Sequence, residues 1–381
     1  PARARSTLRQ GIMSVLVVSA LLGLVSLAVS PFLPTWLGGN SHITPTASAY
    51  FAIVATALPI FQFSIFGAGM LRSSGNMVVP SVMSVVMMSL DVVFNFFLIF
   101  PTRLVELFGT QIMMPGMGLG VVGAAIGTVS AELVAASITM YILCFRSKEL
   151  SLRIDTGRFL PTWGVVKRAL HISLPMGLQQ TIMCSAYVMT TIIIAPLGTF
   201  AIAANSFGII IESLCYMPGY GIADAATTLV GQSMGAGRHE LMKRFAWLSV
   251  GLGVTVMAVM GVVMYVGAPV AMAMMTPAEE VRRLGVEVLR IEAFAEPMFA
   301  AAIVSYGVFV GAAKTLVPSI MNLISIWGVR ISLAAMLAPS MGLRSVWIAM
   351  CIELCFRGLI FLVKLKFWNI QTSCKHYGKD Q

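Results

Sequence analysis

The sequence predicts an all-α polytopic membrane protein, and three observations lead to this fold class. First, 58% of the 381 residues are hydrophobic and only 10% are charged, with a mean hydropathy of +0.90, whereas a soluble domain carries about 25% charged residues. Second, the apolar residues gather in ten runs, each long enough to cross about 30 Å of hydrocarbon as a helix. Third, one motif occurs twice along the chain. This composition excludes a soluble enzyme.

The ten predicted helices follow from the apolar runs, and their boundaries are good to about four residues. Pro80 and Pro318 stand at the start of their runs, where the missing N–H of a proline does no harm to a helix. We expect helices over residues 11–35, 49–71, 79–101, 119–145, 165–195, 200–233, 245–274, 288–312, 315–338 and 345–367.

The basic residues predict how these helices are oriented. Lys and Arg lie in alternate loops, eighteen in one set and four in the other, and cytoplasmic loops carry the excess. The poorer set consists of Arg103, Arg282, Arg283 and Arg344. We therefore expect both ends of this chain in the cytoplasm, and the protein in the cell (inner) membrane. This placement argues against a nucleic-acid partner, although the net charge is +10.

A domain boundary is expected at the segment 146–168, which is polar, basic and interrupted by Gly157 and Pro161. We expect this link to lie in the cytoplasm. The predicted parts are an N-terminal lobe over 1–145 with four of six helices, the link over 146–168, a C-terminal lobe over 169–367 with six helices, and a cytoplasmic tail over 368–381.

An internal repeat predicts that the two lobes are built alike. The segment GMLRSSGNMVVPSVM at 69–83 matches GVFVGAAKTLVPSIM at 307–321, with an offset of 238 residues. At this offset Pro1 falls on His239, so the two helices expected over 165–233 have no partner in the first half. We therefore expect two parallel six-helix lobes, the first of which lacks its first two helices here. Parallel repeats of this kind suit alternating access.

The stretch 207–237 is the strongest candidate for a functional site. It is apolar enough for a bilayer, yet it carries Glu212, Asp224 and a Pro218-Gly219 step. A carboxylate in hydrocarbon is costly and usually faces a bundle interior, and a helix break at that depth needs protein or water around it. Glu212 lies about twelve residues, or about 18 Å, into its helix, near the midplane where transporters place their sites. We therefore predict a broken helix with Glu212 as the coupling carboxylate.

Six segments carry a combined pattern, namely GMLRSSGNMVVP (69–80), LDVVFNFFLIF (90–100), GLGVVGAAIGT (118–128), IESLCYMPGYGIADAATTLVGQSMGAG (211–237), GVFVGAAKTLVP (307–318) and WGVRISLA (327–334). Together they resemble the multidrug and toxic compound extrusion (MATE) family of efflux transporters. The resemblance covers essentially residues 1–367 and implies a twelve-helix fold in two lobes around a central cleft, with ten helices in this chain. It also implies multidrug efflux, in which amphipathic, often cationic compounds leave against inward H⁺ or Na⁺.

The chain departs from this family at the positions of a sodium site. Some sodium-coupled members carry a Glu in the helix that begins with LPMGLQQTIM here, and this chain has Met183 at that position. Phe299 stands near the position of the Asp that is paired with it in those members. Glu296 lies about one helical turn before Phe299. The resemblance therefore implies H⁺ or Na⁺ as the coupling ion without deciding between them. Glu212, by contrast, fits the pattern of a large bacterial branch of the family.

Two further acids lie inside expected spans of the first lobe. Asp91, with Asn95 one turn later, is either a contact for a cation or substrate or a hydrogen-bond anchor between helices. Glu132 lies in the middle of its span, where an acid either serves transport or is paired with a neighbour.

The second lobe contains the remaining candidates. Glu296 shares a helix face with Glu292 and lies deeper in the membrane. Asp224 lies nearer the inner surface and either contacts the ion or caps the broken helix. Gln180, like its neighbour Gln179, faces either the cleft or an adjacent helix.

Three other charged residues favour a structural network. Glu353 precedes Arg357 by four residues, which is the better order for an ion pair along a helix. Arg330 is expected at a similar depth, so a network that holds the helices together is the plainer interpretation of all three.

The leading functional hypothesis is a secondary antiporter for amphipathic or cationic compounds rather than an enzyme. The mid-span acids outnumber the mid-span bases, which favours cationic cargo, because flippases of lipid-linked saccharides in a related superfamily need bases to face a pyrophosphate. The alternatives to the antiporter are such a flippase, a passive channel and an inactive truncated transporter. We expect no cofactor, no metal site and no phosphate-binding motif, and a monomer in the lipid bilayer.

Overall fold

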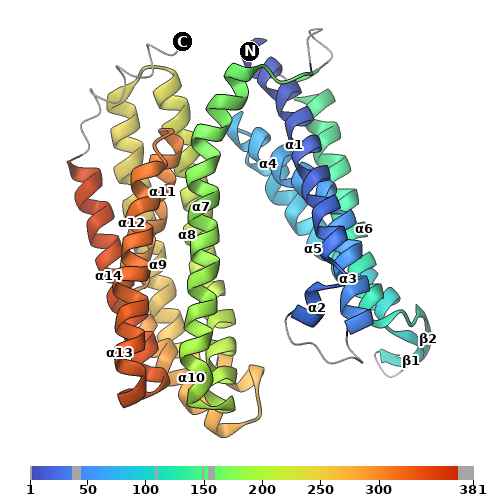
Figure 1. Ribbon diagram of the computed structural model, residues 1–381, viewed down its shortest axis with the longest axis vertical. Helices are drawn as coiled ribbons and strands as arrows, with labels where there is room; N and C mark the ends of the chain where they lie inside the picture. Colours follow the sequence, from blue (N-terminus) through green and yellow to red (C-terminus); the bar gives the residue numbers. More distant parts are fainter. Residues whose placement is uncertain (1, 37–43, 108–109, 148–149, 153–158, 368–381) are drawn as a thin grey trace. The chain divides into compact units, whose positions relative to one another are not determined.

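The computed structural model describes residues 2–36, 44–107, 110–147, 150–152 and 159–367, and its elements are helices apart from one hairpin (Figure 1). Eight of the described helices are long and apolar enough to cross a membrane, or up to ten if each of two bent pairs is one span. This confirms the polytopic helical fold class, and the ten predicted spans correspond to these elements. The predicted tail over 368–381 lies outside the described residues, as do parts of the predicted link.

The chain divides into two compact units, Pro1–Lys167 and Arg168–Gln381. The first unit contains α1 (Ala2–Val29), α2 (Leu33–Trp36), α3 (Thr44–Thr56), α4 (Leu58–Ser73), α5 (Val78–Ile99), β1 (Pro101–Leu107), β2 (Thr110–Met117), α6 (Gly120–Tyr141) and the π-helix η1 (Ile142–Arg146). The helix α7 (Trp163–Ile194) begins in the last residues of this unit and continues into the second.

The second unit continues with helices (Figure 1). They pack around a large apolar core, and a smaller cluster of Ala186, Ile326 and Ile331 joins α7 to η3. Its elements after α7 are the 3₁₀-helix η2 (Ala195–Leu197), α8 (Thr199–Gly235), α9 (His239–Met275), α10 (Glu279–Glu292), α11 (Glu296–Gly311), α12 (Leu316–Leu323), the π-helix η3 (Ile324–Ile331), α13 (Ser332–Met341) and α14 (Leu343–Lys366).

The connection between α5 and α6 was expected as a loop and is a β-hairpin. β1 and β2 pair antiparallel, with Pro101 opposite Met117 and Leu107 opposite Thr110. The hairpin connects two helices that run in opposite directions and pack against each other. It is a local addition to the helical fold, because its strands form a sheet of only two members.

The two copies of the repeated motif fold into the same turn. In each copy one residue has a left-handed backbone, Gly75 at φ 89° and Ala313 at φ 55°, and these positions differ by the offset of the repeat. The backbone hydrogen bonds also correspond in the two copies. In the first, the N–H groups of Ser74, Gly75 and Asn76 donate to the carbonyls of Met70, Arg72 and Leu71, respectively. In the second, the N–H groups of Ala312, Ala313 and Lys314 donate to those of Val308, Val310 and Phe309. This pattern ends a helix and satisfies its last carbonyl groups.

Each unit also contains one bent pair of helices at matching places in the sequence. α3 and α4 meet at 45°, and α10 and α11 meet at 59°. The bends fall on ATALP at 55–59 and AFAEP at 293–297, and the proline of each lies in the first turn of the second helix. Proline is tolerated there because that N–H has no partner within the helix.

The same glycine packing supports both bends. A side chain at Gly23 would come within 3.0 Å of the carbonyl oxygen of Ala55, and one at Gly261 would come within 2.7 Å of that of Ala293. These two glycines also differ by the offset of the repeat. The absence of a side chain at these glycines therefore lets α1 and α9 approach the backbone carbonyls at the bends.

The predicted break at Pro218-Gly219 is wrong, because α8 runs continuously from Thr199 to Gly235. Pro218 lies inside the helix, and the helices packed around it stabilise the backbone there. Gly219 is buried against Met257 of α9, whose sulfur would lie 3.0 Å from a side chain at that position. The breaks of this fold lie in the two bent pairs instead.

Close backbone packing holds α11 against α8. Side chains at Gly307 and Gly311 would collide with the backbone of Ala223 and Thr227 on α8. Thr227 Oγ1 donates a hydrogen bond of 2.8 Å to the carbonyl of Gly307. Small residues and one hydroxyl thus replace hydrophobic contacts as the force between these helices, as is usual in a bilayer.

Candidate functional site

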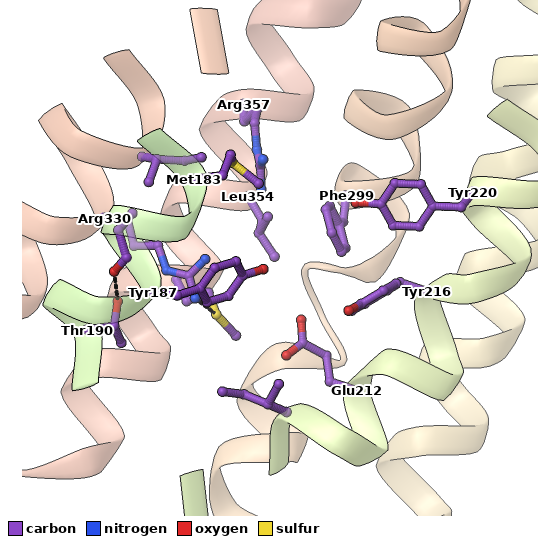
Figure 2. A pocket seen from close by; sticks show the side chains of 14 residues that line it. Met183, Tyr187, Thr190, Glu212, Tyr216, Tyr220, Phe299, Arg330, Leu354 and Arg357 are labelled. Carbon is purple, nitrogen blue, oxygen red and sulfur yellow. Dashed lines mark hydrogen bonds between the residues drawn. The ribbon is translucent and has the colours of Figure 1, made fainter. Parts of the chain in front are cut away.

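The second unit encloses a cavity among α7, α8, α11, η3 and α14 (Figure 2). Its volume is about 50 Å³, which is room for a few water molecules. The lining residues are Met183, Ala186, Tyr187, Thr190, Ile209, Glu212, Tyr216, Tyr220, Phe299, Ile326, Arg330, Met350, Leu354 and Arg357. One carboxylate, two guanidinium groups, four aromatic rings and the hydroxyl of Thr190 therefore line a space whose other walls are apolar.

Helix α8 supplies the acid and two of the rings. Glu212, Tyr216 and Tyr220 are spaced by four residues and so project from one face of the helix. Glu212 is only 7% exposed, and Figure 2 shows its carboxylate pointing into the cavity beside Tyr216. The ring of Tyr216 lies 5.6 Å from that of Tyr220 and 5.5 Å from that of Phe299. These rings fix the face from which the acid projects.

Arg357 on α14 reaches the cavity as part of a buried ion pair. Its Nε atom lies 3.0 Å from Oε1 of Glu353, whose side chain is 0% exposed. The hydroxyl of Ser325 donates a bond of 2.6 Å to the same carboxylate. The guanidinium also lies over the ring of Phe299, 5.4 Å from its centre. The predicted pair between Glu353 and Arg357 is confirmed.

Arg330 lies on the π-helix η3 and lines the cavity opposite Tyr216 (Figure 2). One of its terminal nitrogens contacts the sulfur of Met350 on α14. Its Nε atom is buried and has no hydrogen-bond partner among the described residues. A π-helix is rare, and it often marks a functional position in a helix. Arg330 is thus less constrained than Arg357.

The electrostatic surroundings of Glu212 come from helices distant in the sequence. The positive charge of Arg330 has the larger electrostatic influence on the Glu212 carboxylate, and that of Arg357 has the smaller one. No base lies within one turn of Glu212 on its own helix, as the sequence already indicates. The expectation that acids outnumber bases does not hold for the lining of this cavity, where two guanidinium groups face one carboxylate.

Glu296 lies next to this cavity without lining it. It is the first residue of α11, directly after the bend, and Glu292 is the last residue of α10. Each is only 1% exposed. Because the bend falls between them, the two acids lie on different helices and do not share the single helix face that their spacing predicts. Both still lie within electrostatic reach of Glu212.

Asp224 and Gln180 lie away from the cavity. Asp224 is exposed on α8, and its carbonyl accepts a bond of 3.1 Å from the hydroxyl of Thr228. It does not cap a broken helix, because α8 is continuous there. Gln180 is exposed on α7, whereas the side-chain oxygen of Gln179 is buried without a hydrogen-bond partner in the described part of the chain.

The two acids of the first lobe lie in the first unit. Asp91 on α5 is half-buried, and its Oδ1 atom has no hydrogen-bond partner among the described residues. Asn95, one turn later, packs its side chain against Gly127 of α6. Glu132 on α6 is 6% exposed. The structure therefore does not bring these acids together with Glu212 inside one unit.

Sequence reasoning missed the aromatic and basic lining of the cavity. The spacing of Tyr216 and Tyr220 behind Glu212 is a signal that the sequence contains. Arg330 and Tyr187 come from η3 and α7, and no local pattern joins them to Glu212. Within the residues that the structure describes, no group of three or more His, Cys, Asp or Glu side chains has the geometry to hold a metal ion.

Comparisons with known proteins complete the description. The profile of the MatE family matches residues 1–97 and 175–336. A probable multidrug resistance protein NorM of Thermotoga maritima is 26% identical over 329 residues, which are 85% of this chain and 67% of that protein. A second NorM, of Xylella fastidiosa, is 27% identical over 275 residues, 68% of this chain and 58% of that protein. The chain thus aligns with about three fifths of the length of such relatives.

Solved structures show the same fold at low sequence identity. A MATE protein in complex with MaL6 matches with a TM-score of 0.86 and 18% identity, over 97% of this chain and 80% of that one. A transporter of the MOP superfamily from Pyrococcus furiosus, described as having a binding pocket of reverse polarity, matches with a TM-score of 0.83 and 18% identity, over 95% of this chain and 78% of that one. These likenesses concern the fold alone.

Proposed function

This chain belongs to the MatE family, and we propose that it works as a secondary antiporter that exports amphipathic and cationic compounds in exchange for inward H⁺. Its place is the cell (inner) membrane, with both ends of the chain in the cytoplasm, and it acts as a monomer. The NorM relatives are named as multidrug resistance proteins, which supports drug-like cargo. The buried carboxylate of Glu212 in a small cavity of the second unit carries the proposal.

The size of the cavity indicates what it holds. Sites for drug-sized molecules have volumes of roughly 300–1,000 Å³, whereas this cavity offers about 50 Å³. It accommodates a proton on Glu212 and a few water molecules, but not the cargo. We therefore assign this cavity to ion coupling.

The charges around Glu212 favour H⁺ over Na⁺ as the coupling ion. Hard metal cations are bound by several oxygen ligands at once, and the cavity offers one carboxylate beside hydroxyl groups of tyrosine and threonine. Arg330 and Arg357 lie beside this single acid, and their positive charge disfavours a bare metal cation there. A proton needs no such shell, because it binds covalently to a single carboxylate oxygen.

Exchange then follows from competition for one acid. The ionised Glu212 attracts organic cations to this unit, and protonation removes that attraction and releases the cargo. Inward H⁺ thereby drives outward cargo by alternating access, as parallel repeats permit.

Replacement of Glu212 tests this proposal. In liposomes with an imposed proton gradient, Glu212→Gln should abolish transport of a cationic dye, and Glu212→Asp should retain part of it with a shifted pH optimum. Asp224→Asn is the matched control, because it changes an exposed acid on the same helix. Transport by Glu212→Gln at the normal rate would assign coupling to another acid, with Asp91 and Glu296 next to be tested.

A flippase for lipid-linked saccharides is the second candidate, because two guanidinium groups line the cavity. A pyrophosphate would be recognised by such groups. Arg357 is already paired with Glu353 at 3.0 Å, however, and the remaining Arg330 is balanced by Glu212. A flipping assay with a fluorescent lipid pyrophosphate separates the two functions, since the antiporter should leave that lipid where it was added.

A further inference from the structure

Two buried carboxylates lie at the bend between α10 and α11, and neither of them lines the cavity. Glu292 ends α10 and Glu296 begins α11, and both are 1% exposed. All four of their carboxylate oxygens are buried without a hydrogen-bond partner among the described residues. Buried polar groups are almost always paired, so a pair of buried acids without any donor requires an explanation.

The bend itself does not need these acids. In the first unit the matching bend of α3 and α4 carries Val54 and Leu58 at the positions that Glu292 and Glu296 hold in the second. Gly23 approaches the side chain of Leu58 as Gly261 approaches that of Glu296. The two units therefore build one bend with apolar residues and the other with carboxylates, so the acids were not selected for the backbone shape.

The charged and titratable groups around the pair come from every neighbouring element. Those facing Glu292 are Glu212 on α8, Arg330 on η3, Glu296 on α11, and Cys351, Glu353 and Cys355 on α14. Those facing Glu296 include Glu212, Cys215 and Tyr216 on α8. From α9 the contact is Gly261, which brings no charge. Arg330 is thus the cation that acts on Glu292, and it acts on Glu212 as well.

A count of charges in this cluster leaves two acids without a counter-ion. Glu353 is neutralised by Arg357 in the ion pair of 3.0 Å. Arg330 acts first on Glu212 and balances that carboxylate. Glu292 and Glu296 then have no cation of their own, and an isolated ionised carboxylate is not stable in an apolar interior. A metal ion does not fill the deficit, because no described group of three such side chains has the geometry for one.

We infer that Glu292 and Glu296 form a second proton-binding site beside the Glu212 cavity, and that each carboxyl group carries a proton in this conformation. Neither residue lines the cavity. The bend between α10 and α11 is the element whose movement would expose the pair. This inference rests on the proposed proton coupling only in its consequence, namely that more than one proton moves for each exported cation.

Infrared spectroscopy of the purified full chain in lipid nanodiscs tests the site without any transport. Protonated carboxyl groups have a C=O stretching band that carboxylates lack. Glu292→Gln and Glu296→Gln should each remove part of the band that persists at neutral pH, and the double variant should remove both parts. Glu287→Gln is the control on the same helix, because Glu287 is partly exposed and paired with Arg344 at 2.6 Å. This variant should leave the band unchanged.

Spectra of Glu292→Gln and Glu296→Gln identical to that of the original chain would overturn the inference. Loss of folding in both variants would also overturn it, because glutamine has the shape of a neutral carboxyl group and should be tolerated. Glu296→Leu provides a second check, since leucine occupies the matching position at the bend of the first unit. This variant should keep the fold and lose the same part of the band.

The transport consequence has its own measurement. The membrane voltage at which dye flux stops, at a known proton gradient, gives the number of protons exchanged for each cation. A value above one that falls in the Glu292→Gln and Glu296→Gln variants supports the inference, and a value of one contradicts it. A chain that moves no dye under any proton gradient contradicts the proposed function, and the infrared assignment is then judged separately.

Discussion

The two Arg–Glu pairs of the second unit should differ widely in what they contribute to stability. Arg357 and Glu353 form a pair whose side chains are 8% and 0% exposed, whereas the side chains of Arg344 and Glu287 are 53% and 30% exposed. Removal of one partner of a buried pair leaves an uncompensated charge and costs about 3–5 kcal/mol. Insertion of a single charge at a helix centre in a bilayer costs a similar ~2.5–3.5 kcal/mol. Exposed pairs contribute about 1 kcal/mol or less.

We therefore expect Arg357→Leu to lower the free energy of unfolding by about 3–5 kcal/mol, and Arg344→Leu by about 1 kcal/mol or less. The double variant Glu353→Leu/Arg357→Leu should recover most of the loss, because apolar residues of similar volume replace a buried pair at little cost. The hydroxyl of Ser325 then loses its acceptor, at about 1 kcal/mol, and the ring of Phe299 loses the guanidinium above it.

The assay is unfolding of the purified chain in mixed micelles by increasing denaturant, followed by tryptophan fluorescence. The chain contains 6 Trp, so the signal reports on the folded state without a label. The reasoning is refuted if Arg357→Leu costs no more than Arg344→Leu. It is equally refuted if the double variant is as unstable as the single one, since the lost stability would then not come from an unpaired charge.

Three further outcomes are expected. Trp347→Phe should cost about 1 kcal/mol in the same unfolding assay, because its Nε1 atom donates a bond of 3.1 Å to the side chain of Asn205 on α8; no change would show that this bond is not formed. Gly307→Ala should cost about 1–3 kcal/mol, because a side chain would enter the backbone of α8 at Ala223, whereas Gly251→Ala, which faces open space, should be neutral. A single cysteine at Ser147 should resist an impermeant reagent in whole cells, and labelling from outside would contradict the proposed orientation.

Hydropathy was sufficient to predict the spans, and the repeat was sufficient to predict that the two units are built alike. A run of apolar residues must be helical in a bilayer, because only a helix or a closed barrel satisfies its own backbone there. The matched turn at Gly75 and Ala313 shows that the offset of 238 residues reflects structure and not chance. Local sequence could not place Arg330 near Glu212, since α8 and η3 meet only through tertiary packing.

The misplaced break shows why a proline alone is a weak signal. Pro218 and Pro297 both lie in apolar stretches, yet the first stays inside a continuous helix and the second follows a bend of 59°. The backbone before Pro297 is packed against Gly261, and the matching bend before Pro59 is packed against Gly23. A bend therefore requires a partner helix with a gap for the exposed carbonyl, which sequence shows only when two copies are compared.

The differences between the copies also locate the charges. At the offset of the repeat, Glu292, Glu296 and Arg330 correspond to Val54, Leu58 and Val92, all apolar. Since the bend of the first unit forms with apolar residues, the fold places no demand for charge on two of these three positions. A charge in a bilayer is costly wherever the fold does not need it, so its presence indicates a different role. The acids at the bend and Arg330 beside Glu212 are therefore best explained together, as parts of the proton-binding cluster that we propose for the second unit.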